Sequence, residues 1–463
     1  MTETEKLIRI SVEKYKDNIA YSDGNTGIGY KELIARSDYL AGLLRRQGNS
    51  PAVIYMKSGY EFLTLIIACI FAGRTYIPVD ISTPAARLEQ IAKSVQCDLV
   101  LTDTDIKIEG IDCVHTEELK DCKSRPVRQA ENDTIYIIFT SGSTGNPKGV
   151  PVSDSNLINF ISWISGLAPL SSQRNIKVFN QANFGFDLSV AGIYYSLCNG
   201  HTLCLANDKP GGIPRDADAA VITPTFAKLC LLDKTFNNTN YKKLKTVYFC
   251  GEQLSAKTAD RLFDCFPDLR ILNAYGPTEA TSAVSATEIT RQTAAVGGFL
   301  PCGDIDKAAV GITIENGSII LCGKSVSNGY IGISSDSFTK RNGLNCYNTG
   351  DSGFIENGKL YCKGRNDSQI KYKGYRIELA DIENNICGIS EVNDCAVTVR
   401  YGSSGEIKTI QAYVTGNITA EEIKEKLSEK IPSYMIPKTV IITDKLPVNP
   451  NGKTDRKALT DYD

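Results

Sequence analysis

The sequence predicts an α/β fold in which helices cover β-sheets, with a smaller α+β unit at the carboxyl end. Two patterns support this prediction. Short β-branched runs alternate with helical stripes of apolar residues over most of the 463-residue chain, which is typical of sheets covered by helices on both faces. After about residue 364, alternating strands and one charged helix follow instead. We therefore expect a large amino-terminal domain and a separate unit of about a hundred residues.

The elements of the first part can be assigned in order along the chain. An apolar stripe at helical spacing covers residues 30–47 and ends at Gly48, and residues 51–56 follow as a strand. Residues 61–73 predict a buried helix, and residues 75–80 predict a strand that ends in Asp80. The apolar run at 62–73 is too short to span a bilayer, so we expect no membrane insertion.

Composition argues against several classes of function. Lys and Arg number 51, Asp and Glu number 53, and the formal net charge is -2. A chain this close to neutral has no general attraction for nucleic acid. The charged amino terminus has no apolar signal segment, so we expect a cytoplasmic protein. The two histidines, His115 and His201, lack a metal-binding spacing with carboxylates, which argues against a histidine-ligated zinc site and a Ser-His-Asp hydrolase.

The fifteen cysteines are scattered singly, and no C-x-x-C pair occurs. Without a secretory signal, we expect them to be reduced thiols that are mostly buried. The chemistry is then left to lysine, carboxylates, hydroxyls and backbone amides, with magnesium as a candidate cofactor.

The stretch TSGSTGNPKG, residues 140–149, follows the strand-like run TIYIIF. Its glycines permit positive φ and a close approach of the backbone to a ligand. Its hydroxyls and the ammonium of Lys148 suit an anion with several oxygens, such as a polyphosphate. The order is not that of a Walker A motif, because Asn146 and Pro147 separate Gly145 from Lys148. A flexible Gly/Ser turn is the alternative.

Six further stretches follow this loop in order. They are FDLSV (186–190), NAYGPTEAT (273–281), YNTGDSG (347–353), GRNDSQIKYKGYRIELADIE (364–383), IPSYMIP (431–437) and NPNGKTDRKAL (449–459). Together with the loop, they closely resemble the successive core motifs of the adenylate-forming superfamily. Within it they are most similar to the adenylation domains of nonribosomal peptide synthesis and to the D-alanine:carrier-protein ligases. The resemblance covers essentially the whole chain from Gly29 onwards.

Members of this superfamily are ligases that use ATP to convert a carboxylic acid into an acyl-adenylate, release pyrophosphate, and pass the acyl group to a thiol. The resemblance implies the adenylate-forming enzyme fold, with an ATP- and amino-acid-binding core at residues 1–366. It also implies a mobile lid domain at residues 367–463, with Asp367 as the hinge. After adenylation, the lid is expected to rotate and to bring the KYKGYRIEL face to the cleft.

The resemblance further implies an ATP site. Its residues are Thr140, Ser141, Gly142, Ser143, Thr144, Gly145, Lys148, Asn273, Ala274, Tyr275, Gly276, Pro277, Thr278, Asp351, Arg365 and Lys453. The loop corresponds to the residues that hold the β- and γ-phosphates, Thr278 to a ligand of the α-phosphate, and Tyr275 to the ring that stacks on adenine. Asp351 matches the carboxylate that accepts both ribose hydroxyls, with Arg365 in support.

Two charged residues complete the predicted chemistry. Glu279 matches the superfamily's ligand for Mg²⁺. Lys453 matches the catalytic lysine that contacts the substrate carboxylate and the α-phosphate, where it offsets charge that develops in the transition state. Structural alternatives stay open. Thr278 and Glu279 also fit the start of a helix, and Tyr275 could be a tyrosine of the core. Asp351 could belong to a turn, and Lys453 could be a solvated side chain.

The resemblance places the amino acid in a second group of residues, which are Asp187, Leu188, Ala191, Cys250, Gly251, Ser282 and Lys453. Asp187 matches the residue that pairs with the α-ammonium of the substrate, and an Asx helix cap supported by Ser189 is the alternative. Cys250 matches a cysteine that D-alanine ligases place against the substrate. Ala191 and Ser282 stand where those ligases have larger apolar residues. The predicted substrate is therefore D-alanine or another small or polar amino acid.

The acceptor thiol is expected on another molecule, because the chain holds no G-G-x-S-like carrier motif. We expect the phosphopantetheine of a separate carrier protein. Two alternatives stay open, namely an acyl-CoA ligase that uses free coenzyme A, and a nucleotide or amino-acid sensor without catalysis. The basic residues Lys371, Lys373 and Arg376 could also be read as a nucleic-acid patch. The near-neutral composition, and the absence of interleaved aromatic platforms beyond Tyr372 and Tyr375, argue against that reading.

Overall fold

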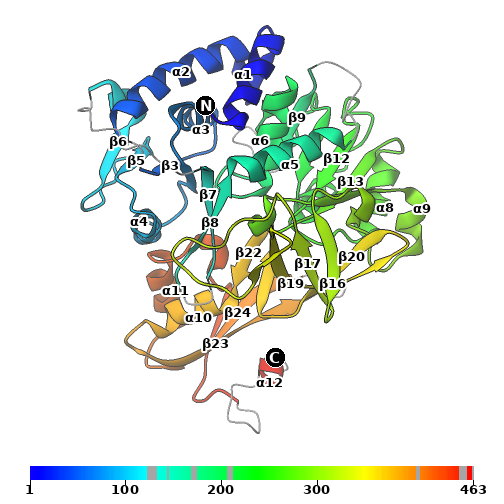
Figure 1. Cartoon of the computed structure of the whole chain (residues 1–463). Coiled ribbons are helices and arrows are strands. Elements are labelled where there is room, and N and C mark those ends of the chain that lie inside the picture. The colour runs from blue at the N-terminus through cyan, green and yellow to red at the C-terminus, as the bar shows by residue number, and fades with distance from the viewer. Residues whose placement is uncertain are drawn as a thin grey trace. The chain divides into compact units, whose positions relative to one another are not determined.

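The computed structural model describes residues 1–48, 50–121, 133–142, 145–167, 175–205, 212–402, 407–447 and 456–460 (Figure 1). The chain divides into two compact units. The first contains Met1–Asp80, Val95–Ile138 and Gly149–Asn366, and the second contains Ile81–Ser94, Phe139–Lys148 and Asp367–Asp463. A boundary thus falls at the predicted hinge. Two segments of the range 1–366 group with the carboxyl-terminal part, so a contiguous domain over 1–366 stays a prediction.

The first unit contains an eight-stranded sheet with the order β14-β13-β12-β11-β9-β10-β1-β2. Its strands are β1 (Ile19–Ser22), β2 (Gly27–Gly29), β9 (Lys177–Asn180), β10 (Thr202–Cys204), β11 (Ala219–Ile222), β12 (Thr246–Phe249), β13 (Arg270–Tyr275) and β14 (Ser285–Ile289). The strands from β13 to β1 are parallel, and the edge strands β14 and β2 pair antiparallel. Both β11 and β12 are buried along their whole length, as expected for parallel strands covered on both faces.

A second sheet of the same unit has the order β6-β5-β3-β4-β7-β8. Its strands are β3 (Ala52–Met56), β4 (Tyr76–Asp80), β5 (Leu99–Thr102), β6 (Asp112–His115), β7 (Thr134–Thr140) and β8 (Lys148–Ser153). The pairs from β6 to β7 are parallel. The strands predicted at 51–56 and 75–80 are confirmed as β3 and β4.

Helices pack against these sheets. They are α1 (Glu3–Tyr15), α2 (Tyr30–Arg46), α3 (Tyr60–Ala72), α5 (Asp154–Gly166), α6 (Leu188–Asn199), α7 (Pro224–Cys230), α8 (Ala256–Cys265) and α9 (Arg291–Val296). The predicted helices at 30–47 and 61–73 are confirmed as α2 and α3. Every residue of α3 from Phe62 to Phe71 is buried, because a helix that is apolar on all sides belongs inside the protein. One core cluster joins α2, α3, α5 and α6 to strands of both sheets.

The single tryptophan, Trp163 of α5, donates its Nε1–H to the carbonyl oxygen of Lys307 at 2.8 Å. This bond ties α5 to the 3-10 turn Ile305–Lys307. Within the described ranges, no helix combines the length and the apolar character needed to cross a bilayer.

A third, antiparallel sheet completes the first unit, with the order β15-β20-β19-β17-β16 and with β18 paired to β19. Its strands are β15 (Gly303–Asp304), β16 (Gly311–Glu315), β17 (Ser318–Cys322), β18 (Phe338–Arg341), β19 (Leu344–Glu356) and β20 (Lys359–Arg365). All of them follow the strands of the first two sheets in the sequence.

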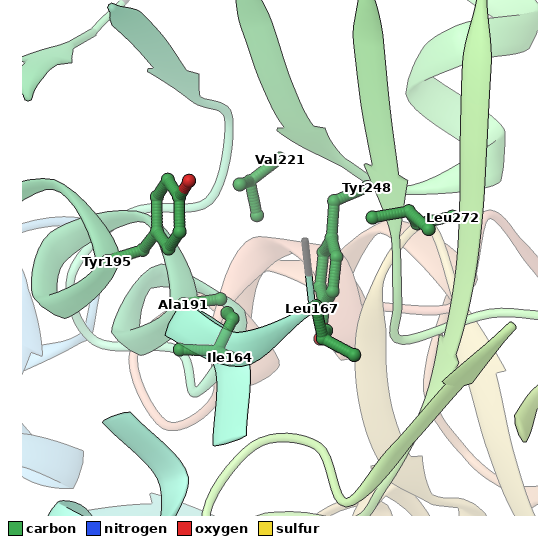
Figure 2. A pocket seen from close by; sticks show the side chains of 7 residues that line it. All are labelled: Ile164, Leu167, Ala191, Tyr195, Val221, Tyr248 and Leu272. Carbon is green, nitrogen blue, oxygen red and sulfur yellow. The ribbon is translucent and has the colours of Figure 1, made fainter. Parts of the chain in front are cut away.

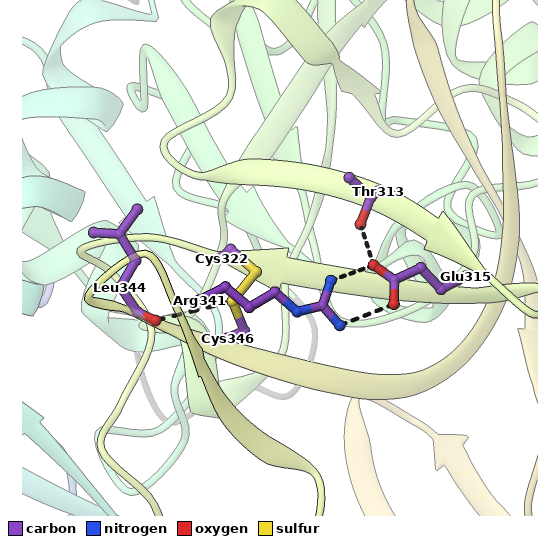
Figure 3. The surroundings of a disulfide bond; sticks show 6 residues. All are labelled: Thr313, Glu315, Cys322, Arg341, Leu344 and Cys346. Atoms are coloured by element: carbon purple, nitrogen blue, oxygen red, sulfur yellow. Dashed lines mark hydrogen bonds and ion pairs between the residues drawn. A yellow bond between two sulfur atoms is a disulfide. The ribbon is translucent and has the colours of Figure 1, made fainter.

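The expectation that all cysteines are reduced is wrong for one pair. Cys322 and Cys346 are register partners on β17 and β19 and form a disulfide. Figure 3 shows this bond near the ion pair between Arg341 and Glu315. The sequence shows neither the register of the two strands nor which cysteines face each other, so the pairing was not predictable from spacing. The other cysteines among the described residues are free thiols.

The second unit contains α4 (Ala85–Ser94), the loop between β7 and β8, and the carboxyl-terminal elements. These are β21 (Gln369–Tyr372), β22 (Tyr375–Glu378), α10 (Leu379–Cys387), β23 (Val392–Tyr401), β24 (Ile407–Gly416), α11 (Ala420–Ser428), β25 (Thr439–Ile442) and α12 (Arg456–Thr460). The three strands β23, β24 and β25 form one sheet, and an apolar cluster joins it to α10 and α11. The predicted α+β character after residue 364 is confirmed, but the expectation of one helix is wrong, because α10, α11 and α12 occur there.

Replacing Cys322 and Cys346 together by serine is expected to lower the free energy of unfolding of the first unit by about 3 kcal/mol without reductant. The reason is that the crosslink, with a sequence separation of 24 residues, restricts the unfolded chain. Urea titration of both proteins measures the difference. With reductant present, wild type and variant are expected to unfold together. A non-reducing peptide map without a Cys322–Cys346 linkage contradicts the pairing.

Candidate functional site

The predicted binding residues of the first unit gather where the parallel strands of the eight-stranded sheet end. Cys250 and Gly251 directly follow β12, and Gly276 directly follows β13. Asp187 precedes α6, the helix that comes after β9. In open parallel sheets, ligands bind beyond the carboxyl ends of the strands. The topology therefore brings together segments that lie far apart in the sequence.

Asp187 and Thr278 are in direct contact at this edge. Thr278 Oγ1 donates a hydrogen bond to Asp187 Oδ2 at 2.5 Å. Asp187 occupies the N-cap position of α6, but its side chain makes no capping hydrogen bond, so the alternative of an Asx cap is wrong. Ser189 instead donates to the carbonyl oxygen of Phe186 at 2.7 Å. The Asp187 carboxylate is thus directed at the segment after β13 and not at its own helix.

A second carboxylate, Asp351, is held by two donors. Tyr275 Oη donates to Asp351 Oδ2 at 2.7 Å, and Arg365 Nη1 lies 3.1 Å from Asp351 Oδ1. Asp351 lies within β19, opposite Arg365 on β20, so the alternative of a turn is wrong. Burial and the nearby Asp351 carboxylate raise the pKa of Tyr275 well above its usual value, which keeps this hydroxyl protonated. Each carboxylate oxygen retains a second lone pair for a ligand hydroxyl.

The predicted role of Tyr275 as an adenine platform stays a prediction. Its side chain is 4% exposed and belongs to an apolar cluster of the third sheet. This agrees with the alternative of a core tyrosine. The hydroxyl, which the sequence analysis did not use, is the group with a defined partner in the site.

The rest of the 273–278 segment is fixed by close packing. Asn273 donates its side-chain amide to the carbonyl oxygen of Pro301 at 2.7 Å. A Cβ at Gly276 would lie 2.4 Å from the Cα of Ala283, so only glycine fits there. Ala274 is buried, and Pro277 precedes a single 3-10 turn, Thr278–Ala280. Thr278 and Glu279 therefore do start a short helix, in addition to any role in binding.

Glu279 is fully buried and accepts a hydrogen bond from the Tyr330 hydroxyl at 2.6 Å. No group of three or more His, Cys, Asp or Glu side chains that could hold a metal occurs among the described residues. A magnesium ion at Glu279 would therefore depend on oxygens that the nucleotide supplies, which is a common arrangement for Mg²⁺. Tyr330 was not predicted, because 51 residues separate it from Glu279.

The turn after this segment is strained. Thr281 and Ser282 have φ values of 60° and 70°, which residues other than glycine rarely adopt, least of all a β-branched one. Thr281 Oγ1 is held by the carbonyl oxygen of Ser325 at 2.8 Å. Cys250 Sγ faces the Ser282 carbonyl oxygen at 3.9 Å. Strain of this kind concentrates at functional sites, and here it falls on two residues beside the predicted substrate cysteine.

A small cavity lies deeper in the same part of the sheet (Figure 2). It is lined by Ile164, Leu167, Ala191, Tyr195, Val221, Tyr248 and Leu272. Its volume is about 10 Å³, which is room for about one water molecule. Of the predicted substrate residues, Ala191 belongs to this lining. Leu188 is buried one turn earlier on α6, and Gly251 has a φ of 89° at the end of β12.

The predicted phosphate loop lies in the second unit and depends on its glycines. A Cβ at Gly142 would lie 2.1 Å from the carbonyl oxygen of Asn146. Gly145 has a φ of 83°, and its N–H donates to the Gly142 carbonyl oxygen at 3.0 Å. Lys148 begins β8 directly after the loop. The backbone thus turns so tightly that no other residue fits at position 142.

Carboxyl-terminal residues of the same unit contact this loop. Ser141 Oγ accepts from the Glu378 N–H at 2.9 Å and donates to the Arg376 carbonyl oxygen at 3.0 Å. Arg87 of α4 donates to the Gly145 carbonyl oxygen at 3.0 Å and to Asp381 Oδ2 at 2.9 Å. The predicted phosphate loop is therefore held from both sides by an ion pair and by hydrogen bonds.

Asp381 is fully buried beside Arg87. Burial raises the pKa of Asp381, while Arg87 and a hydrogen bond from the Gly142 N–H oppose that rise. The Asp381 carboxylate thus accepts a hydrogen bond from a backbone N–H of the predicted phosphate loop. The amides of such a loop suit phosphate oxygens. Neither Arg87 nor Asp381 was predicted from the sequence. The one indication of them in the sequence was a charged residue on the buried face of each of the two helices, 85–94 and 379–387.

Some predicted residues are not placed. Lys453, Ser143 and Thr144 lie outside the described residues. Asp367 accepts the N–H of Gln369 at 3.1 Å and stands at a unit boundary, and its role as a hinge stays a prediction. Arg456, which follows Lys453 by three positions in the sequence, donates to both carboxylate oxygens of Glu383 at 2.7 and 2.9 Å.

Three sheets with this strand order, a small carboxyl-terminal α+β part, and carboxylates at the strand ends are the architecture of the adenylate-forming enzymes. The family model "AMP-binding enzyme" matches residues 8–331, and the model "AMP-binding enzyme C-terminal domain" matches residues 381–453. The chain belongs to the AMP-binding enzyme family, and the superfamily predicted from the motifs is confirmed.

Individual proteins agree with this assignment. The chain is 38% identical, over an alignment of 493 positions that includes gaps, to the D-alanine--D-alanyl carrier protein ligase of Listeria monocytogenes serotype 4a, with 96% of each chain covered. The protein of the same name from Bacillus cereus (strain AH187) is 34% identical over 486 residues, again with 96% of each chain covered.

Solved structures confirm the predicted fold class. The Vibrio cholerae adenylation domain AlmE, solved in complex with glycyl-adenosine-5'-phosphate, superposes with a TM-score of 0.85 at 23% identity, and the match covers 99% of this chain and 97% of that one. The o-succinylbenzoate CoA synthetase of Bacillus subtilis superposes with a TM-score of 0.84 at 20% identity, with 98% of each chain covered.

Replacing Arg87 by methionine is expected to lower the free energy of unfolding of the second unit by about 3–5 kcal/mol at about pH 8, because Asp381 is left buried without its cation. The loss of Arg87 raises the pKa of Asp381 further. A carboxyl whose folded-state pKa lies above its unfolded value destabilises the fold as pH rises, so the deficit is expected to be smaller at about pH 5. Urea unfolding at both pH values measures it.

The matched control is Glu391→Gln, which removes an exposed ion pair with Lys426 in the same unit. This variant is expected to unfold like the wild type at both pH values, because exposed ion pairs contribute little. A deficit in Arg87→Met that is equal at both pH values contradicts the role given to Asp381.

Proposed function

We propose that this chain activates a small amino acid with ATP to an aminoacyl-adenylate, and then transfers the aminoacyl group to the phosphopantetheine thiol of a separate carrier protein. One observation carries this proposal. The Asp187 carboxylate does not cap α6 and contacts Thr278 Oγ1 at 2.5 Å. A group that can pair with an ammonium thus stands next to the predicted ligand of the α-phosphate. An amino acid whose ammonium binds Asp187 has its carboxylate close to the reacting phosphorus.

The relatives support a short side chain. The proteins from Listeria and Bacillus are named for D-alanine and for a carrier protein, so D-alanine is the first substrate to test. A cavity of about 10 Å³ at Ala191 also favours a side chain of one or two heavy atoms. Because ATP and carrier proteins of this kind are used inside the cell, we place the reaction in the cytoplasm.

The proposed chemistry has two half-reactions. First, a carboxylate oxygen of the amino acid attacks the α-phosphorus of ATP, the bond from that phosphorus to the bridging oxygen breaks, and pyrophosphate leaves. Second, the carrier thiol attacks the acyl carbonyl, AMP leaves with the bonding electrons, and the thiol proton is released. Charge develops on phosphate oxygens in the first step, so cationic and N–H groups lower its barrier.

The residues of this chain have distinct parts in that scheme. Asp351, fixed by Tyr275 and Arg365, is proposed to accept the ribose hydroxyls. Glu279 would bind Mg²⁺ together with phosphate oxygens, and the ion supplies positive charge there. Lys453 is proposed to contact the substrate carboxylate and the α-phosphate. The loop from Thr140 to Lys148 is proposed to hold the β- and γ-phosphates.

The proposal is tested by amino-acid-dependent exchange of pyrophosphate into ATP. The panel contains D-alanine, L-alanine, glycine, larger amino acids and aryl acids, and thioester formation is then compared on a carrier protein and on free coenzyme A. Exchange with a small amino acid and transfer to the carrier are expected. If only aryl acids support exchange, Asp187 does not bind a substrate ammonium. If the acyl group is transferred only to free coenzyme A, the chain is an acyl-CoA ligase.

Asp187→Asn is expected to raise the KM for the amino acid about 100-fold, because it removes a charge-assisted hydrogen bond to the ammonium. The KM for ATP is expected to change by less than about two-fold. Steady-state pyrophosphate exchange measures both. Glu288→Gln, which breaks an exposed ion pair with Arg270 in the same unit, is the control and should leave both values unchanged. Equal rises in the two KM values speak against an ammonium site at Asp187.

Lys453→Ala is expected to lower the kcat of pyrophosphate exchange by about 1000-fold, because it removes a charge aimed at the developing anion. Binding of ATP, followed by equilibrium titration, should weaken only a few-fold. Transfer from a supplied aminoacyl-adenylate to the carrier should persist. Lys445→Ala, which removes an exposed lysine eight positions earlier in the sequence, serves as the control. Exchange at the wild-type rate in Lys453→Ala rules out the catalytic lysine.

A further inference from the structure

Two free thiols of the second unit lie in contact with each other. Cys387 is the last residue of α10, Cys395 lies on β23, and their sulfur atoms are 3.3 Å apart. A disulfide bond is about 2.0 Å long, so the two sulfurs need to approach each other by only about 1.3 Å more. Small changes in the two χ1 angles can provide a shift of this size.

Packing holds the two elements that carry these thiols. Ile382 and Ile386 of α10 belong to one apolar cluster with Cys395 and Val397 of β23. The Cys395 thiol also donates to the backbone carbonyl oxygen of Glu383 at 3.3 Å. The carboxylate of the same Glu383 accepts the Val397 N–H at 2.8 Å. The carboxyl-terminal half of α10 is therefore fixed on β23, and the two sulfurs are kept close by several independent contacts.

The two thiols differ in their access to solvent. Cys387 is exposed, whereas Cys395 is only 7% exposed. Burial, together with the hydrogen bond to Cys387, raises the pKa of Cys395, so this thiol is protonated at physiological pH. An oxidant in solution therefore meets Cys387 first, and Cys395 stands behind it as the second thiol. This division into an attacking and a resolving thiol is typical of redox-active cysteine pairs.

We propose that Cys387 and Cys395 form a reversible oxidation site, which a low-molecular-weight disulfide such as oxidised glutathione converts from a dithiol into an intramolecular disulfide. The site goes beyond the proposed function and does not depend on it, because neither cysteine belongs to the residues assigned to ATP or to the amino acid.

The oxidation has two steps. Cys387 Sγ, as the thiolate, attacks one sulfur of oxidised glutathione, whose S–S bond breaks, and one glutathione thiolate leaves with the bonding electrons. Cys395 then gives its proton to water and attacks Cys387 Sγ, and the second glutathione leaves as a thiolate. In total the protein loses two protons and two electrons, and oxidised glutathione is reduced to two glutathione molecules.

The product joins the end of α10 covalently to β23 and removes the hydrogen bond from the Cys395 thiol to Glu383. Reduced glutathione reverses both steps, so the state of the pair follows the ratio of oxidised to reduced thiols around the protein. The dithiol in the structure is the form expected where reducing thiols are abundant.

The test is a non-reducing peptide map of the full-length, folded chain after incubation with oxidised glutathione, acid quenching and alkylation. Residues 377–400 form one tryptic peptide that contains both cysteines. The expected bond lowers the mass of this peptide by two hydrogens and prevents its alkylation. Further cleavage after Glu391, between the two cysteines, leaves the halves joined, and an excess of reduced glutathione restores alkylation of both.

Two variants separate the roles of the thiols. In Cys395→Ala, Cys387 is expected to keep one glutathione as a mixed disulfide. In Cys387→Ser, modification of Cys395 is expected to be at least about 100-fold slower than in the wild type, because the buried thiol reacts only after local opening. Cys265→Ser is the matched control, since it removes a free thiol that also ends a helix, α8. This variant should form the 387–395 bond as the wild type does.

Several results would overturn the proposal. One is full alkylation of both thiols in the wild type after the incubation. Another is a wild-type Cys387 that stays linked to glutathione, which would mean that Cys395 does not reach it. A bond from Cys387 to a different cysteine or to a second chain, or a 387–395 bond that forms only in urea, also contradicts the site. If Cys395→Ala does not fold, the wild type and Cys387→Ser still decide.

Discussion

The hydrogen bond between Tyr275 and Asp351 connects the end of a parallel strand, β13, to the middle of an antiparallel strand, β19. Both side chains are buried, and the bond joins two sheets through residues that lie 76 positions apart in the sequence. The Asp351 carboxylate in turn positions Arg365 on β20. This bond therefore helps to hold the residues proposed to bind the nucleotide in a fixed position, together with the hydrogen bond from Lys359 to Thr287 and the apolar cluster that Tyr275 shares with the third sheet.

The other constraint is the parallel arrangement of the eight-stranded sheet. Its central strands all end at one edge, so the segments after β9, β12 and β13 converge there. Side-chain contacts such as the hydrogen bond from Thr278 to Asp187 then link these segments. The polar and the apolar side chains lie at different depths below this edge. Polar groups such as Asp187 and Thr278 stand at the edge, and the apolar side chains around the small cavity lie beneath.

Much of this arrangement could be predicted from the sequence, because the motifs are local. The glycines of the loop, the acid Asp187 directly before α6, and the strand ends all depend on neighbouring residues. Arg87, Tyr330 and the Cys322–Cys346 bond were not predictable in the same way. Each depends on the register or packing of distant segments, and an arginine in an amphipathic helix or a lone tyrosine has no local pattern that reveals its partner.

The sequence also left alternatives that only geometry decides. The spacing of Asp187 and Ser189 is that of a capped helix, and the structure shows the carboxylate turned toward Thr278 instead. Asp351 stands before a Ser-Gly pair that is typical of turns, yet the chain continues through it as a long strand. In both cases the tertiary partner outweighs the local preference, which is common at functional sites.

The indole of Trp163 has a practical meaning. It is the single tryptophan of the chain, and it belongs to the first unit, while the second unit contains tyrosines and no tryptophan. Indole emission therefore follows the first unit alone, whereas circular dichroism follows both. Comparing Trp163 fluorescence with circular dichroism during unfolding can therefore show whether the two units unfold together or one after the other.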